Sequence, residues 1–121
     1  MKRFLTALTA IAATIGLTFG LTACAPQTVD MSTVTAVIDV RTPEEFATGH
    51  LEGAINVDWE GSTFQSDIAQ FDPAGTYILY CRSGNRAGQA KTAMESMGFT
   101  HLSNAGGLND AAAVTGLAIV Q

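Results

Sequence analysis

Residues 77–98 constrain the fold of this chain more than any other stretch. They begin with an apolar, strand-like run at residues 77–80 and continue through a polar segment that starts at Cys81. A helix-like pattern then runs from Arg86 to Met97, and Gly98 ends it. A strand that passes through a short loop directly into a helix is half of a parallel β–α–β unit. This stretch therefore predicts a parallel sheet.

The remaining segments alternate between strand and helix in the same way. The predicted strands are residues 34–40, residues 53–57 and a short segment around 101–102. Three further helices are predicted: one that begins after the cap Thr42, one that carries Phe64, Ile68 and Phe71, and one over residues 108–115. This alternation predicts an α/β fold, an open and mainly parallel sheet with helices on both faces. The active site of such a sheet lies beyond the carboxyl ends of its strands, where Cys81 is expected.

The first 23 residues have the pattern of a secretory signal peptide. Lys2 and Arg3 precede an uncharged apolar run, which ends in the sequence LTAC at residues 21–24. This ending resembles the lipobox of bacterial lipoproteins, which implies lipidation of Cys24 as the first residue of the mature chain. The alternative is an uncleaved anchor, since the run is about long enough to span a bilayer. Either case predicts an extracytoplasmic, membrane-anchored protein of the cell envelope.

Removal of residues 1–23 leaves 98 of the 121 residues, enough for one domain. We expect a tether at 24–33, a folded domain at 34–121, and a monomer. The signal takes two of the six basic residues with it, so four basic and eleven acidic side chains give the mature chain a charge of −7. Such a surface argues against nucleic acid and against electrostatic binding to anionic lipid, so a lipid has to hold the protein at the membrane.

Cys81 is expected to be a nucleophile. The chain has two cysteines, and lipidation of Cys24 leaves Cys81 without a disulfide partner. The small, polar and basic residues after it lead into a helix N-terminus, an arrangement whose backbone N–H groups bind anions and favour the reactive thiolate. The alternative, an inert core cysteine, fits poorly with so polar a neighbourhood.

Three segments together resemble the rhodanese (sulfurtransferase) domain family. The first reads VIDVRTPEEF at 37–46 and GHLEGAINV at 49–57, the second YCRSGNRA at 80–87, and the third NAGGL at 104–108. The likeness covers the chain from about Val34 to its end and points to the single-domain members. Many members have tryptophan where this chain has Ala111, a departure that concerns the packing of the last helix and not the chemistry.

The resemblance implies a residue-by-residue assignment of roles. Cys81 takes a sulfane sulfur from thiosulfate or a similar donor and passes it to cyanide or a thiol, without cofactor or metal. The implied substrate-binding residues are Arg82, Ser83, Gly84, Asn85, Arg86 and Ala87. Their backbone N–H groups cradle the persulfide, Arg82 holds the donor's oxygens, and Arg86 does the same or braces the loop.

Other residues receive supporting or neutral interpretations. Asp39 and Arg41 are expected to organise the end of the first strand, and Glu45 is expected to pair with Arg41. His50 is interpreted as a hydrogen-bonded turn residue and not a base, and Trp59 as packing or the rim of a pocket. His101 receives no function, and two separated histidines with one free cysteine do not predict a zinc site.

Two other functions fit parts of the sequence. A phosphatase or arsenate reductase would use a related loop, but such relatives have five residues between cysteine and arginine, whereas four separate Cys81 from Arg86. A persulfide carrier or interaction module without turnover is the second alternative, and the presence of Cys81 counts against a module that lacks chemistry.

Overall fold

The computed structural model describes residues 28–121. The predicted signal peptide, the lipidation site Cys24 and the start of the tether lie outside the described residues. Within the described part, no helix is both long and apolar enough to cross a membrane.

The central sheet has four parallel strands in the order β3-β1-β4-β5. The strands are β1 Ala36–Asp39, β3 Ile55–Asn56, β4 Thr76–Tyr80 and β5 His101–Asn104. In the register, Ile38 of β1 lies between Ile55 of β3 and Leu79 of β4. The two inner strands, β1 and β4, are formed by apolar runs, because inner strands of a parallel sheet are covered by helices on both faces and apolar side chains suit both. The predicted open, parallel α/β sheet is confirmed.

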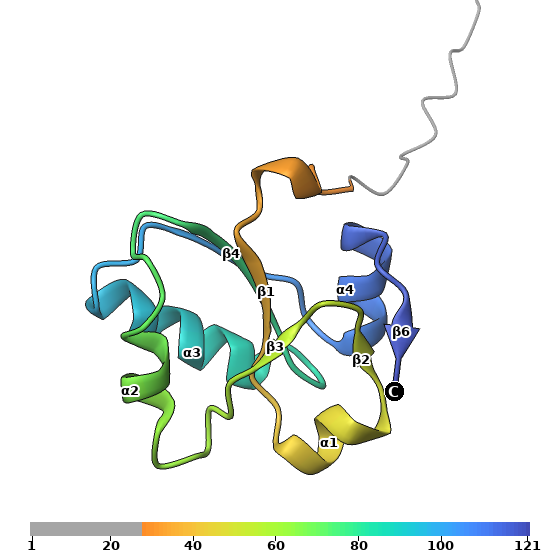
Figure 1. The fold of residues 1–121 in the computed structure, drawn as a ribbon, viewed down its shortest axis with the longest axis horizontal. Coiled ribbons are helices and arrows are strands. Elements are labelled where there is room, and N and C mark those ends of the chain that lie inside the picture. The colour runs from red at the N-terminus through yellow and green to blue at the C-terminus, as the bar shows by residue number, and fades with distance from the viewer. Residues whose placement is uncertain (1–27) are drawn as a thin grey trace, which may run out of the picture.

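Alternate side chains of β4 pack on opposite faces of the sheet. Tyr77, Leu79 and the following Cys81 join a cluster that includes residues of α2 (Phe64–Ile68) and α3 (Asn85–Ser96). Ile78 and Tyr80 join a second cluster beneath α4 (Leu108–Thr115). Figure 1 shows α2 and α3 on one side of the sheet and α4 on the other. Two hydrophobic layers therefore hold β4 and the loop that follows it.

The helix after β1 begins where the sequence predicts. Thr42 caps α1 (Pro43–Thr48), with its hydroxyl accepting a hydrogen bond from the Glu45 N–H at 3.3 Å. Proline at the first helical position lacks only an N–H that would have no partner there. The helix ends before Gly49, which caps its carboxyl end as the sequence predicts. This short helix carries Glu45 to the carboxyl edge of the sheet.

Two parts of the structure differ from the sequence prediction. A small antiparallel pair, β2 (His50–Leu51) with β6 (Ile119–Val120), was not predicted, because two-residue strands show no periodicity. The predicted tether reached residue 33, but Met31–Thr33 form a 3₁₀ helix, and the Val29 N–H bonds to the Val114 carbonyl at 2.7 Å. The folded part of the chain therefore begins before residue 34.

Ala111, in the place where tryptophan was expected by resemblance, is a fully buried residue of α4. It packs in the cluster that contains Leu51, Ile78 and Tyr80. The large Tyr80 side chain rises from β4 into this cluster, so a small residue on α4 is sufficient to close the layer.

Candidate active site

The site lies at the carboxyl edge of the two inner strands. Cys81 follows the last residue of β4, and Arg41 follows the end of β1 by two positions. Cys81 is a free cysteine and fully buried. Neighbouring parallel strands bring their following loops together at the same edge, which places residues 39–45 beside residues 81–86.

Backbone N–H groups point at the Cys81 sulfur. The Gly84 N–H donates to Sγ at 2.9 Å, and the Ala87 N–H donates at 3.5 Å. The loop curls through Gly84, whose φ of +93° lies in the left-handed region that favours glycine. Ala87 lies in the first turn of α3, so the positive end of that helix is also directed at the sulfur. Of the residues predicted to bind substrate, the loop exposes Arg82, Ser83 and Asn85 at the surface.

The glycine pair packs directly against this loop. The Cys81 N–H bonds to the Gly106 carbonyl at 3.0 Å. A Cβ at Gly107 would lie 2.5 Å from the Arg82 carbonyl oxygen, and one at Gly84 would lie 3.1 Å from Gly106 Cα. The two loops approach this closely because both carry glycine at the contact.

Asn104, which the sequence reasoning did not single out, links the same two loops. Its side-chain amide donates to the Gly84 carbonyl at 2.8 Å, and its amide oxygen accepts from the Gly106 N–H at 2.9 Å. The sequence pointed to this role only through the position of Asn104 at the end of β5, next to the glycine pair. Its hydrogen-bond partner Gly84 lies 20 residues away along the chain, so the sequence did not reveal the contact.

Glu45 pairs with Arg86 and not with Arg41, which corrects the expected pairing. Its two carboxylate oxygens accept from Arg86 Nη1 at 2.7 Å and Nη2 at 2.9 Å. The hydrogen bond to Arg86 lowers the pKa of Glu45 to about 2. The same bond raises the pKa of Arg86. This bidentate pair ties α1 to the start of α3 and so braces the loop.

The Glu45–Arg86 pair gives folding a specific pH dependence. Because the folded-state pKa of Glu45 lies below its ordinary value of 4.5, the pair contributes its full stability above about pH 4.5 and loses it as the pH falls towards 2. Glu45→Gln is expected to be less stable than wild type near neutral pH, with a difference that shrinks through this window. Urea unfolding at several pH values measures it, and a difference that stays constant between pH 5 and 2 would contradict the assignment.

Arg41 forms a buried pair with Asp39, consistent with a supporting role at the end of β1. Its Nη2 lies 2.7 Å from one carboxylate oxygen, its Nε lies 3.0 and 3.1 Å from the two oxygens, and Nη2 also donates to the Gly49 carbonyl at 2.6 Å. Hydrogen bonding to Asp39 raises the pKa of Arg41. Tyr80 lies beneath the guanidinium, its ring centre 5.7 Å away, and burial raises the pKa of its hydroxyl.

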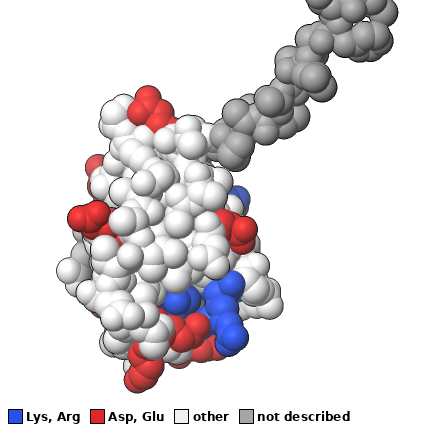
Figure 2. Space-filling view, turned by 90° about the vertical axis from the view of Figure 1, so that its right-hand side faces the viewer, with Lys and Arg blue, Asp and Glu red and all other residues white. Residues whose placement is uncertain are grey.

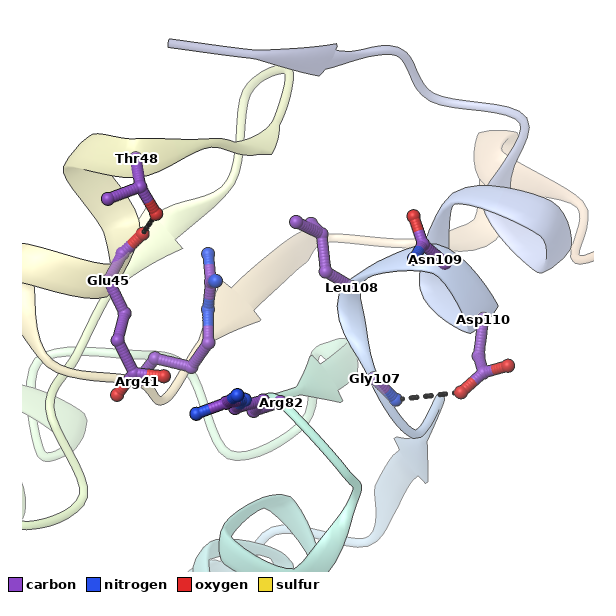
Figure 3. Close-up of a pocket in the computed structure, with 8 residues that line it drawn as sticks. All are labelled: Arg41, Glu45, Thr48, Arg82, Gly107, Leu108, Asn109 and Asp110. Carbon is purple, nitrogen blue, oxygen red and sulfur yellow. Dashed lines mark hydrogen bonds between the residues drawn. The ribbon is translucent and has the colours of Figure 1, made fainter.

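A cavity of about 580 Å³ opens beside the Cys81 loop. Figure 3 shows the cavity between α1 and the first turn of α4, with the side chains of Arg41 and Arg82 in the space between these helices. Its lining residues are Arg41, Glu45, Thr48, Arg82, Gly107, Leu108, Asn109 and Asp110. Figure 2 shows most of the visible basic side chains near the lower edge of one face, beside acidic side chains, while other acidic side chains are scattered over a face that is mostly uncharged. The cavity is thus a polar opening lined by Arg82, the residue that follows Cys81, although Cys81 itself does not line it.

Comparison with known proteins decides the family. The sequence model of the Rhodanese-like domain matches residues 25–113. The chain belongs to the rhodanese family.

Individual relatives agree with this membership. The protein is 43% identical over 75 residues to thiosulfate sulfurtransferase PspE of Escherichia coli strain K12, an alignment that covers 62% of this chain and 72% of that protein. Thiosulfate sulfurtransferase 16, chloroplastic, of Arabidopsis thaliana is 37% identical over 90 residues, with 66% and 75% covered. The solved structure of a rhodanese with anions from E. coli has a TM-score of 0.60 and 37% identity over 71% of this chain and 96% of that one.

The remaining residues singled out in the sequence lie around this rhodanese site without lining its cavity. The His50 Nδ1–H donates to the Phe46 carbonyl at 2.9 Å, and its ring stacks on Phe46 with 3.7 Å between ring centres. His50 is hydrogen-bonded as predicted, although it lies in β2 and not in a turn. Trp59 donates from Nε1 to Gln89 at 2.9 Å and packs edge-on against Phe64.

Proposed function

We propose that this rhodanese domain is a sulfurtransferase that moves a sulfane sulfur from an anionic donor such as thiosulfate to cyanide or a thiol. The Cys81 thiolate attacks the outer sulfur of the donor, the donor's S–S bond breaks, and sulfite leaves with the bonding electrons. The acceptor then attacks the outer sulfur of the persulfide, and the Cys81 thiolate is restored. Each step is a displacement, so no external oxidant or reductant is needed.

One observation carries the proposal: the sulfur of a buried, free cysteine accepts two backbone N–H hydrogen bonds from the start of a helix. Nests of this kind bind negative charge, and the thiolate and the terminal sulfur of a persulfide are both anionic. The proposed activation of Cys81 therefore rests on backbone dipoles and nearby arginines and requires no histidine base.

The size of the loop favours sulfur over phosphate. Four residues separate Cys81 from Arg86, and Arg86 is held by Glu45 at the edge of the loop. Thiocyanate formation from thiosulfate and cyanide is expected to exceed hydrolysis of an aryl phosphate, which should stay at background. Faster phosphate hydrolysis than thiocyanate formation by the purified protein would favour the phosphatase alternative.

Arg82→Ala is expected to raise the KM for thiosulfate. Arg82 is exposed, lines the cavity and forms no ion pair within residues 28–121, so its charge is available to the donor's oxygens. Loss of a charge-assisted hydrogen bond, about 1.5–3 kcal/mol, lowers kcat/KM by about tenfold to a hundredfold. Steady-state kinetics with varied thiosulfate tests this, and an unchanged kcat/KM would remove Arg82 from donor binding.

We further propose that the protein is a lipoprotein of the cell envelope, which acts as a monomer held at the membrane by acyl chains on Cys24. The support is the basic, apolar and LTAC pattern of residues 2–24.

Cys24→Ala is expected to abolish labelling by a radioactive or clickable fatty acid, because the acceptor sulfur is gone. Cys81→Ser provides the matched control and should remain labelled. Normal acyl labelling of Cys24→Ala would show that the lipid, if any, is attached elsewhere.

A further inference from the structure

A closed ring of four hydrogen bonds connects the Cys81 sulfur to the end of β5. The Cys81 N–H donates to the Gly106 carbonyl at 3.0 Å, and the Gly106 N–H donates to the Asn104 amide oxygen at 2.9 Å. The Asn104 amide nitrogen donates to the Gly84 carbonyl at 2.8 Å, and the Gly84 N–H donates to Cys81 Sγ at 2.9 Å. Three members of the ring other than the sulfur use backbone groups or an amide, and Asn104 is the one that contributes a side-chain amide.

Gly84 is the member of this ring with the greatest conformational freedom. It lacks a Cβ, so its backbone has to be held in one conformation by contacts from outside the residue. Its carbonyl accepts from two sides, from the Gly88 N–H of α3 at 2.9 Å and from the Asn104 amide. The Gly106 backbone packs against it, since a Cβ at Gly84 would lie 3.1 Å from Gly106 Cα. These three contacts together fix the direction of the Gly84 N–H that reaches the sulfur.

Asn104 can influence the sulfur only through this ring. The residue is exposed, and it is not among the residues that line the cavity. If its amide were removed, water could bond to the Gly84 carbonyl and to the Gly106 N–H. A water molecule satisfies these groups but does not tie them covalently to β5, so the Gly84 peptide would no longer be held in one direction. The consequence would appear at the Gly84 N–H and thus at Sγ.

We propose that Asn104 is a positioning residue for sulfur transfer, which holds the Gly84 peptide so that its N–H stays on the Cys81 sulfur and stabilises negative charge there. This inference rests on the proposed function, in which Cys81 reacts as a thiolate. The step affected is the loading of sulfur. The thiolate attacks the outer sulfur of thiosulfate, the donor's S–S bond breaks, and sulfite leaves with the bonding electrons. Asn104 takes no part in these bond changes.

The charged groups around the Cys81 loop come from the loop itself and from the elements beside it. They are Asp39, Arg41, Glu45, Glu60, Arg82, Arg86 and Asp110. Replacement of the Asn104 amide by an apolar side chain leaves all of these charges in place. A change in the pH dependence of loading can therefore be assigned to the ring of hydrogen bonds.

The test measures how fast thiosulfate loads sulfur on Cys81 at a series of pH values, from the mass of the peptide that contains Cys81. Asn104→Ala should load about fivefold more slowly near neutral pH, the net effect of about one hydrogen bond. The deficit should shrink as the pH rises towards about 10, because the sulfur is then a thiolate without the help of the N–H. Ser103→Ala, the same truncation one residue earlier on β5, should load at the wild-type rate at every pH.

Asn104→Leu provides a second variant that keeps the branched outline of the side chain without its hydrogen bonds, and it should show the same pH-dependent deficit. A role in folding alone predicts a different pattern, because a smaller folded fraction lowers the loading rate by one factor at every pH. Circular dichroism of each variant measures that fraction. If one variant does not fold, the other decides the question.

The outcomes separate this inference from the proposed function. Wild-type loading rates in the folded Asn104 variants, or a deficit that is the same at every pH, would overturn the positioning role while the proposed function stands. Failure of both variants to fold would assign Asn104 to the fold and would overturn it as well. Failure of the wild-type protein to load sulfur on Cys81 would instead overturn the proposed function.

Discussion

Cys81→Ser is expected to reduce thiocyanate formation to background while the protein stays folded. Serine fits the buried position because it differs from cysteine only in the smaller oxygen atom, and the Gly84 N–H, which lies 2.9 Å from Sγ, is close enough to bond to it. A hydroxyl is a much weaker nucleophile near neutral pH and cannot hold a transferable sulfur. The assay is cyanide-dependent thiocyanate formation, with circular dichroism and urea unfolding to establish the fold.

Ser96→Ala, a small change at the far end of α3, serves as the control and should retain full activity. Thiocyanate formation by a folded Cys81→Ser protein at more than a small fraction of the wild-type rate would refute Cys81 as the nucleophile.

Arg41→Ala is expected to have the largest effect on stability. The substitution leaves the fully buried Asp39 carboxylate without its cation, and removal of one partner of a buried ion pair costs about 3–5 kcal/mol. That loss is a large part of the total stability of a small domain. Urea unfolding followed by circular dichroism gives the free energy of unfolding of each variant.

The double variant Asp39→Asn/Arg41→Gln is the matched comparison. It removes both charges together, so no uncompensated charge stays buried, and it is expected to be more stable than Arg41→Ala. An Arg41→Ala protein as stable as wild type would show that the pair does not hold the end of β1.

The features that depend on neighbouring residues could be predicted from the sequence. Thr42, Pro43 and Glu45 predict the start of α1 because capping acts within one turn of a helix. Cys81 could be placed at the end of a strand and before a helix because the apolar run of β4 and the glycine of the loop lie within eight residues of one another in the sequence. The parallel sheet followed from the alternation of such local signals.

The features that depend on residues far apart in the chain could not be predicted from the sequence. Glu45 and Arg86 are 41 residues apart, so nothing in the local sequence of α1 distinguishes Arg86 from the nearer Arg41 as its partner. Arg41 is instead taken by Asp39, because a buried carboxylate requires the nearest cation. Likewise the side-chain amide of Asn104 can link the two glycine-containing loops only once β5 pairs with β4 and brings these loops into contact.

The most direct test of the central claim is the mass of the intact protein after treatment with thiosulfate. The account predicts that the wild-type protein becomes heavier by one sulfur atom, located by fragmentation on the peptide that contains Cys81, and that cyanide removes this atom as thiocyanate. Cys81→Ser treated in the same way should show no gain. A wild-type protein that gains no sulfur, or that gains it at a residue other than Cys81, would contradict a persulfide mechanism at this site.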